Sequence, residues 1–495
     1  MTIPAGIVVL IAMKGTASSI EACIQRIAPR LVLAACTICA FPPTAAADLH
    51  PDDLIAPERR RDQFPKDFGY AAFPYPYRLP GIGSGLSLAA AAFNIADTYT
   101  DAYGIVFAGD VKGGAAGVGD IHLIPRTLIL DLGYSAISKA AFQSYAQRGM
   151  NTGKDDFRLL EVGDTEYYGA RMTATFLDRR LELHGAWYEG ASRLKSIRDK
   201  EGNLILEAQD PPRDRGHTTL LGARFDLTDD YTDPRRGLRL DITRTQSPPR
   251  GSGPDYFVMD YNTTAYIPFR RRDTLALNLL RSDAFVTRQG ETDPAALQQQ
   301  LGLNCAGVAD PTQQQFCNEV IDTTIANNKF GTATSLGGFD RLRSYPQGRF
   351  KGAHTGFFGA EYRWNLTDER TPFDIFVMKS VRTSIQVAFF YETGVTSDTR
   401  SDLYARKNMR ESYGTGLRIV TASGVVLRGD VAHGKEGFNV AIFIGYRGSF
   451  RKPNSIAPRG HSAVDDDLGS GDEARLVGGE EQRRVRGVPP VALDR

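Results

Sequence analysis

The chain has 495 residues and a formal net charge of +1, and 42% of its residues are apolar. This length allows two or three average domains or one large barrel. The near-zero charge gives no sign of nucleic-acid binding. No stretch beyond the N-terminal region holds 18 uncharged apolar residues, which excludes a helical membrane protein. The 26 Phe, 20 Tyr and 50 Gly favour strands and turns, as in an ordinary soluble all-β protein.

Residues 1–47 resemble a targeting segment. Two arginines precede an apolar run at 31–41, and an A-x-A cleavage site ends at Ala47. A start at Met13 would give a signal peptide of conventional length. The residues 33–36 also resemble a lipoprotein box, but the A-x-A site lies in the right place downstream. We therefore expect export through a cleaved signal peptide.

Residues 48–82 are rich in proline and charge and show neither a helical nor a strand period. They include three consecutive arginines at 59–61 and the run Phe-Pro-Tyr-Pro-Tyr at 73–77. This composition predicts an extended periplasmic lead-in before the folded domain. The arginine run is interpreted as a solvated stretch rather than a binding patch.

From residue 83 to 450, short segments alternate between apolar and polar residues and are separated by turn-rich loops. This period of two is typical of strands with one apolar and one polar face. The clearest examples are 236–246, 355–366, 384–392 and 437–450. The pattern predicts an all-β fold.

A soluble sandwich shows the same alternation, so other features must decide. The polar faces carry charges deep within long strands, as at Asp241, Arg418 and Asp430, and the last apolar face ends in Tyr446 and Phe450. Such strands are typical of a transmembrane antiparallel β-barrel with a wet lumen, which leaves no unpaired strand edge. We expect a barrel over 83–450 in the bacterial outer membrane, with 12 to 16 strands at about 10 residues each.

Two stretches lack the strand period. Residues 281–330 look like a loop and hold Cys305 and Cys317, which can close a disulfide in an oxidising compartment or remain two free thiols. The three other cysteines lie in the signal segment. Residues 451–495 mix both charge signs without periodicity and are predicted to be a disordered tail.

Several ordered motifs resemble the bacterial surface antigen superfamily, the outer-membrane assembly and translocation barrels of the BamA and TamA type. The resemblance covers roughly residues 222–450 and implies 16 strands. It rests on a "DDxxxPxxG"-like hairpin, a "GG…RGF/Y"-like signature, a paired strand motif, an "FxDxG"-like motif and the last three strands. These lie at 226–237, 336–345, 359–363, 390–394 and 414–450.

In the family, the loop with the signature folds back into the barrel, and its arginine pairs with acids on the lumen wall. The resemblance assigns this loop to Gly337, Gly338, Arg343 and Tyr345, with Ser344 in place of the usual glycine.

The alternation places Glu361 and Glu392 on polar strand faces, so an inward Arg343 would meet two carboxylates and bond them bidentately. Alternatively, both glutamates face lumen water. Such a pairing would pin the loop without performing chemistry. The resemblance also identifies Phe450, with Tyr446, as the terminal aromatic sorting signal.

Relatives usually carry polypeptide-transport-associated domains before the barrel, and residues 48–80 are too short for one. The chain therefore resembles the branch without an N-terminal domain. The resemblance implies insertion or translocation of proteins at the outer membrane, through a weak seam between segments 83–95 and 437–450. The expected partners of the barrel are outer-membrane lipid and either unfolded client proteins or a periplasmic partner. The alternative is a passive pore or a structural or lipid-handling barrel.

Catalytic motifs are missing from the sequence. It contains no G-x-S-x-G elbow, no HExxH or CxxC motif and no phosphate-binding loop, and its seven histidines are scattered. We expect neither an enzyme nor a cofactor or metal site.

Overall fold

The computed structural model describes residues 63–64, 68–145, 147–207, 213–247, 253–270, 272–301, 304–307, 310–367, 372–375, 378–421 and 425–446. All of these belong to the unit formed by residues 55–495. The predicted signal segment, Phe450 and the predicted tail lie outside the described residues.

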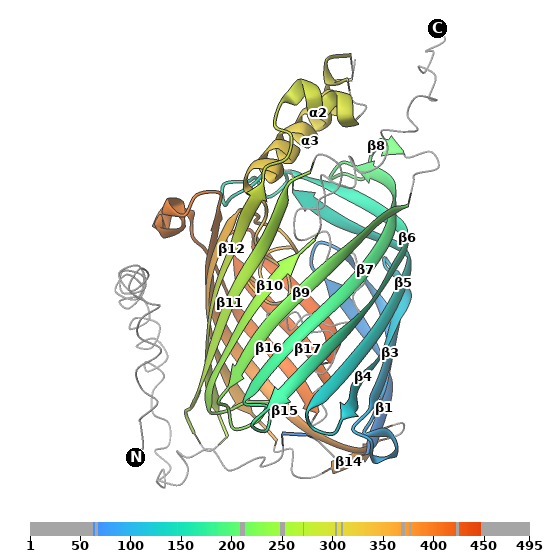
Figure 1. Cartoon of the computed structure of the whole chain (residues 1–495), viewed down its shortest axis with the longest axis vertical. Coiled ribbons are helices and arrows are strands. Elements are labelled where there is room, and N and C mark those ends of the chain that lie inside the picture. Colours follow the sequence, from blue (N-terminus) through green and yellow to red (C-terminus); the bar gives the residue numbers. More distant parts are fainter. Residues whose placement is uncertain are drawn as a thin grey trace. The chain divides into compact units, whose positions relative to one another are not determined.

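Sixteen long antiparallel strands form a closed barrel, as expected (Figure 1). Each strand pairs with the next, and the first returns to the last. The strands are β1 (Gly69–Leu79), β2 (Gly83–Phe93), β3 (Asp101–Gly109), β4 (Lys112–Ile124), β5 (Leu128–Tyr145), β6 (Phe157–Phe176), β7 (Leu181–Arg198), β9 (Asp214–Asp226), β10 (Gly237–Gln246), β11 (Asp255–Pro268), β12 (Thr274–Arg288), β13 (His354–Asn365), β15 (Met378–Ser397), β16 (Arg410–Thr421), β17 (Val425–Gly434) and β18 (Gly437–Tyr446).

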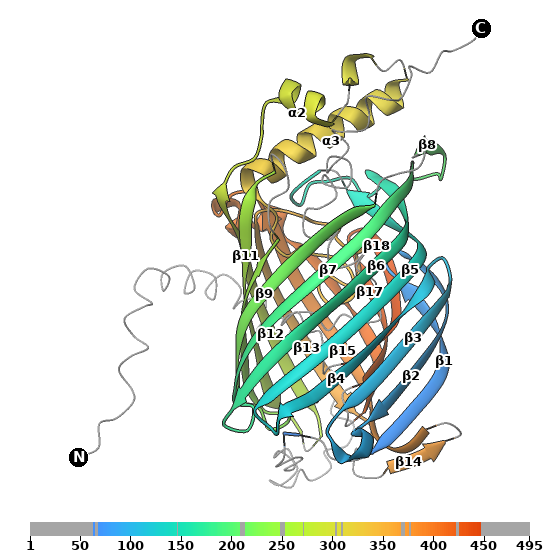
Figure 2. The same cartoon turned by 45° about the vertical axis from the view of Figure 1, so that its right-hand side comes forward.

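The two ends of the barrel differ (Figures 1 and 2). One end, which we name the helical end, carries the short strand β8 (Leu204–Glu207) and the helices α2 (Pro294–Leu301) and α3 (Pro311–Phe330). The other, the turn end, carries the short strand β14 (Pro372–Ile375). The described part of the chain also contains the 3-10 turns η2 (Ile95–Asp97), η3 (Cys305–Gly307), η4 (Ser401–Tyr404) and η5 (Arg406–Asn408). No helix in the described part of the chain is long and apolar enough to cross a membrane.

The expectation of a loop at 281–330 is wrong. Residues up to Arg288 continue β12, and most of the remainder forms α2 and α3. The apolar stripe of α3 is narrow and consists of Phe316, Val320, Ile321 and Ile325, which pack with Cys317 and Leu297. Because polar residues surround this stripe in the sequence, it gives little helical periodicity.

The predicted start of the barrel at residue 83 is also wrong, because β1 occupies the second half of the expected lead-in. It pairs with β2 along its whole length, from Gly69 opposite Phe93 to Leu79 opposite Gly83. Pro74 and Pro76 obscured this strand in the sequence, since prolines are confined to strand edges.

The seam therefore lies between β1 and β18, not at segment 83–95. Within the described residues, the ladder between these strands consists of Arg78 opposite Ile442. Pro74 and Pro76 lie two residues apart, so their missing N–H groups belong to one edge of β1. The unbroken register with β2 means that this edge faces β18. Near the turn end, Tyr70 pairs instead with Lys379 at the start of β15.

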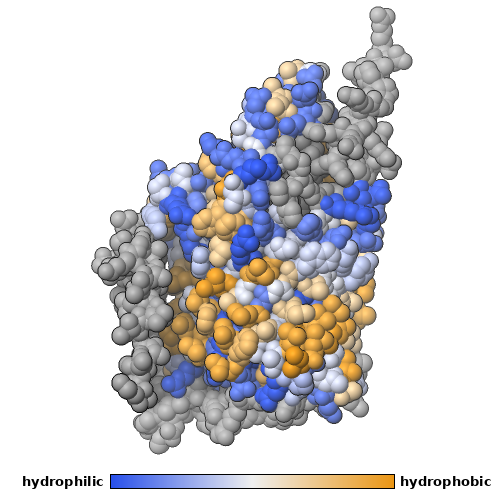
Figure 3. Space-filling view, viewed as in Figure 1, coloured by the Kyte–Doolittle hydropathy of each residue, from blue (hydrophilic) through white to orange (hydrophobic). Residues whose placement is uncertain are grey.

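The apolar residues of the alternating strands face outward and the polar residues face the interior, the reverse of a soluble protein. In β10, Leu238 is 43% exposed on the outside, whereas Arg239 and Asp241 are buried in the lumen. Apolar residues gather in a band across the barrel wall, with hydrophilic residues toward the helical end (Figure 3). An apolar outer band around a polar interior is the arrangement of a membrane-spanning barrel.

Candidate functional site

The loop between α3 and β13, residues 331–353, folds into the barrel, and we call it the signature loop. Leu336, Leu342, Tyr345 and Phe350 are all fully buried (0% exposed). The backbone groups of Leu336 and Phe350 bond each other reciprocally, at 2.9 and 3.0 Å. This bridge closes the loop on itself, so that it enters the lumen as a compact unit.

Gly337 and Gly338 make the tight turn of this loop. Their φ angles are +108° and +106°, a conformation that L side chains rarely adopt. A Cβ on Gly337 would lie 2.1 Å from the carbonyl oxygen of Pro346. The glycine pair therefore lets the two limbs of the loop approach each other closely.

Arg343 lies at the centre of the site, 5% exposed, and binds three acids. Its Nε donates to Glu392 Oε1 at 2.7 Å, and its backbone N–H donates to Glu392 Oε2 at 2.9 Å. Its Nη2 and Nη1 donate to Glu361 and Asp430, each at 3.1 Å. Its Cζ lies 3.4 Å from the ring centroid of Phe390. The structure thus brings Arg343, Glu361 and Glu392 together.

Glu361 is shared among three arginines. Arg418 Nη1 donates to its Oε1 at 2.5 Å, and Arg363 Nε donates to the same oxygen at 2.8 Å. Within β17, Arg428 Nε donates to Asp430 at 2.5 Å. Each buried carboxylate therefore has a guanidinium partner, which offsets its desolvation.

The sequence noted Asp430 and Arg418 only as charges on polar faces, and Phe390 only as the first residue of the "FxDxG"-like motif. Gly416 lies opposite Asp430 in the sheet, and a Cβ there would meet Asp430 Oδ1 at 1.9 Å. The missing side chain leaves room for the carboxylate to turn toward Arg343. A glycine opposite an inward acid on neighbouring strands is the sequence feature that could have identified this partner.

The signature loop also touches both sides of the seam. Toward β1, the backbone N–H of Gln347 donates to the carbonyl of Pro80, in the β1–β2 turn, at 3.0 Å. Toward β18, Arg349 Nη2 donates to Glu436 at 2.8 Å, and the backbone N–H of Lys435 donates to Tyr345 Oη at 3.3 Å. The loop is thus a bridge across the helical end of the seam.

At the turn end, the "DDxxxPxxG"-like segment forms the β9–β10 turn and folds inward. Asp226 accepts from Arg239 at 2.6 Å, and Arg224 Nε donates to Asp241 at 2.5 Å. The hydroxyl of Tyr231 accepts from Arg224 at 3.0 Å. The motif was located correctly, but its inward packing was not visible in the sequence.

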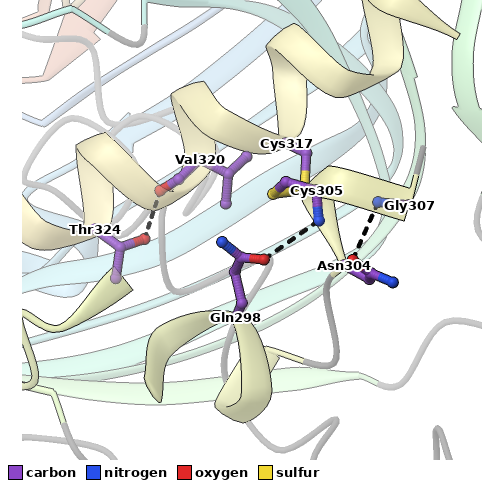
Figure 4. The surroundings of a disulfide bond; sticks show 7 residues. All are labelled: Gln298, Asn304, Cys305, Gly307, Cys317, Val320 and Thr324. Atoms are coloured by element: carbon purple, nitrogen blue, oxygen red, sulfur yellow. Dashed lines mark hydrogen bonds between the residues drawn. A yellow bond between two sulfur atoms is a disulfide. The ribbon is translucent and has the colours of Figure 1, made fainter. Parts of the chain in front are cut away.

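Cys305 and Cys317 form a disulfide, with their Cα atoms 5.4 Å apart (Figure 4). The bond ties the start of α3 to η3, and the backbone N–H of Cys305 donates to Gln298 of α2 at 3.3 Å (Figure 4). Beyond the disulfide, Glu319 of α3 pairs with Arg158 of β6 at 3.1 Å. The helices are thus stapled together and held to the barrel.

The remaining predicted residue, Tyr446, ends β18 opposite Val425. Among the described residues, no group of three His, Cys, Asp or Glu side chains is placed to hold a metal ion.

The match to a family decides the identity of this barrel. Residues 138–436 match the Omp85 superfamily domain. The chain belongs to the Omp85 superfamily. This confirms the expected resemblance and the location in the bacterial outer membrane. Because such barrels have short periplasmic turns and longer outer loops, the turn end of this Omp85 barrel is periplasmic and its helical end extracellular.

Several solved structures match the chain at low sequence identity. BamA from Haemophilus ducreyi lacking POTRA domains 1–3 is 12% identical with a TM-score of 0.39, covering 76% of this chain and 70% of that chain. CdiB from Escherichia coli is 12% identical with a TM-score of 0.41, covering 76% of this chain and 62% of that chain. CdiB from Acinetobacter baumannii is 10% identical with a TM-score of 0.40, and the match covers 76% of this chain and 59% of that chain. No curated protein matches the chain in sequence.

Proposed function

We propose that this Omp85 barrel inserts or translocates polypeptides at the outer membrane by opening between β1 and β18. The observation that carries the proposal is the seam itself, where one ladder pair, Arg78 opposite Ile442, joins the described parts of the two strands. Neighbouring pairs are continuous, as from Val425 opposite Tyr446 to Gly434 opposite Gly437. An edge with unpaired backbone groups is a template for an incoming strand.

Two prolines in the sequence of β1 weaken its pairing with β18. Pro74 and Pro76 remove two donors from the edge that faces β18, at a cost of roughly one hydrogen bond each, about 0.5–1.5 kcal/mol. Their rings point outward and both side chains are exposed. The barrel therefore stays closed through the Arg78–Ile442 pair, the contact of Tyr75 with the backbone of Ile444, and the signature loop, contacts that a client could replace.

The second candidate, a passive pore, is less well supported. The signature loop fills the lumen with fully buried residues such as Leu336 and Tyr345, and Arg343 binds it to the wall. We propose no catalytic activity, since these ion pairs hold a loop in place rather than surround a substrate.

The test replaces Pro74 and Pro76 with valine. Restoring both donors should lengthen the β1–β18 ladder, raise heat resistance and slow the folding of an unfolded outer-membrane barrel into liposomes that contain the variant. Pro268→Val, a strand proline at the end of β11 and away from the seam, is the matched control. If the double variant catalyses client folding as fast as the control, opening at this seam is not part of the function.

A further inference from the structure

An aromatic side chain that precedes the first strand is buried at the periplasmic rim. Phe64 is 2% exposed, and its neighbour Gln63 is 5% exposed. Neither residue belongs to a strand or a helix. Phe64 therefore occupies a site that side chains of the barrel, and not a regular element of its own, have built around it.

Two rings form one wall of this site. Tyr99, in the β2–β3 loop, stacks on His122 of β4, with their centroids 4.4 Å apart and their planes at 12°. Phe64 meets both rings edge to face, at 6.2 Å from Tyr99 and 5.4 Å from His122. Such edge-to-face geometry is the favourable arrangement of aromatic pairs.

Two guanidinium groups also contact the ring of Phe64. The Cζ atoms of Arg126 and Arg179 each lie 5.0 Å from the ring centroid of Phe64. Arg179 is held in place from behind, because it stacks at 3.9 Å on Tyr231 and donates to Glu182 at 2.9 Å. The cation that contacts Phe64 is thus fixed before any ring enters.

The pocket also offers a polar contact. His122 Nδ1 accepts the backbone N–H of Arg126 at 3.0 Å, which leaves Nε2 as the donor of the ring. Within the described part of the chain, this buried Nε2 has no hydrogen-bond partner. A peptide carbonyl beside an inserted ring could accept that bond.

We propose that this pocket is a binding site for an aromatic side chain of an extended polypeptide on the periplasmic side, and that Phe64 fills it while no client is bound. Rings and guanidiniums select an aromatic over an aliphatic side chain of similar size. The three segments that form it, the β2–β3, β4–β5 and β6–β7 connections, all lie at the periplasmic end. The assignment of the bound aromatic side chain to a client polypeptide rests on the proposed function.

The probe is a fluorescent peptide of residues 59–67, which contains Phe64 as its one aromatic residue. Its binding is measured by anisotropy against the full chain in detergent. The Phe64→Ala chain, with an empty pocket, should bind it saturably. The wild-type chain should bind at least tenfold more weakly, because the tethered Phe64 competes at roughly millimolar effective concentration. A peptide with leucine in place of Phe64 should lose about tenfold, since two cation–π contacts disappear together.

A matched pair of variants locates the binding. In the Phe64→Ala chain, Tyr99→Leu should weaken the peptide about fivefold. Tyr134→Leu, the same change at an exposed residue on the outside of β5, should leave affinity unchanged. Three outcomes would each overturn the proposal. The Phe and Leu peptides would bind with equal affinity, the two tyrosine changes would have equal effects, or the peptide would not bind at all.

Folding is checked by heat-dependent migration on detergent gels, and Phe64→Leu replaces Phe64→Ala if the latter does not fold. Peptide binding needs no client insertion. A chain that binds the peptide selectively but is insensitive to the proline changes at the seam would keep the pocket and reject the proposed function. The reverse result would reject the pocket alone.

Discussion

At the scale of single residues, the site depends on one guanidinium shared by three acids. Arg343 binds Glu392, Glu361 and Asp430 from the signature loop, whose backbone also bonds to Ser412 of β16 and Asn439 of β18. Removing one member of a buried pair leaves an uncompensated charge, which costs about 3–5 kcal/mol. The loop position therefore depends in part on this buried charge cluster.

A double-mutant cycle measures this dependence. Arg343→Met should lower the temperature at which the barrel stops migrating as a folded protein on detergent gels. It should also speed proteolysis within the signature loop. Because the two residues bond directly, Arg343→Met with Glu392→Gln should cost less than the sum of the single changes, by about 0.5–3 kcal/mol. Lys195→Met, which breaks an exposed pair with Asp164, is the control and should change nothing. Strict additivity would show that Arg343 and Glu392 are not coupled.

The glycine opposite Asp430 gives a second prediction. Gly416→Ala should displace the carboxylate, because a Cβ would approach its Oδ1 to 1.9 Å, and should lower heat resistance like loss of the ion pair. Gly429→Ala, on the neighbouring strand, meets nothing closer than 4.0 Å and should be neutral. Equal effects of the two alanines in thermal unfolding would contradict the assigned role of Gly416.

The sequence predicted this site in part. Strand alternation shows which face a residue occupies, so Glu361 and Glu392 could be placed in the lumen, but it does not give height along the barrel. Asp430 and Phe390 reach Arg343 through the register of β15–β17 and the depth of the loop, which only the folded barrel defines. Family resemblance, not periodicity, identified Arg343.

At the scale of elements, sequence patterns failed where local preference conflicts with the fold. β1 was missed because it carries two prolines, and these are tolerated only because their edge faces the seam. α3 was missed because its buried stripe is narrow. The strands with clean alternation, such as β10 and β13, were located almost to the residue.

The disulfide prediction belongs to this scale. Replacing Cys305 and Cys317 with serine removes a bond between residues that are 12 positions apart. The helical segment should then lose about 2–4 kcal/mol of local stability. Proteases added from the extracellular side should then cut between α2 and α3. The barrel should keep its heat-resistant migration, because its strands do not depend on this bond. Loss of that migration would show that the helices support the barrel itself.

At the scale of the whole molecule, the closed barrel has one weak line and one loop that bridges it. The signature loop is bound to the β1–β2 turn through Gln347 and to the β17–β18 turn through Arg349, while Arg343 fixes it to the wall between. Loop position and seam closure are thereby linked, so a change at either should be felt at the other.

The most direct measurement joins the seam covalently. Arg78 is the residue of β1 that lies opposite both Ile442 of β18 and Ser84 of β2. The Arg78→Cys, Ile442→Cys pair closes the seam when oxidised, and the Arg78→Cys, Ser84→Cys pair staples a ladder that is already continuous. Folding of an unfolded barrel client into liposomes should stop in the first pair and resume on reduction, whereas the second pair should work in both states. Undiminished client folding with the seam fully cross-linked would contradict the account.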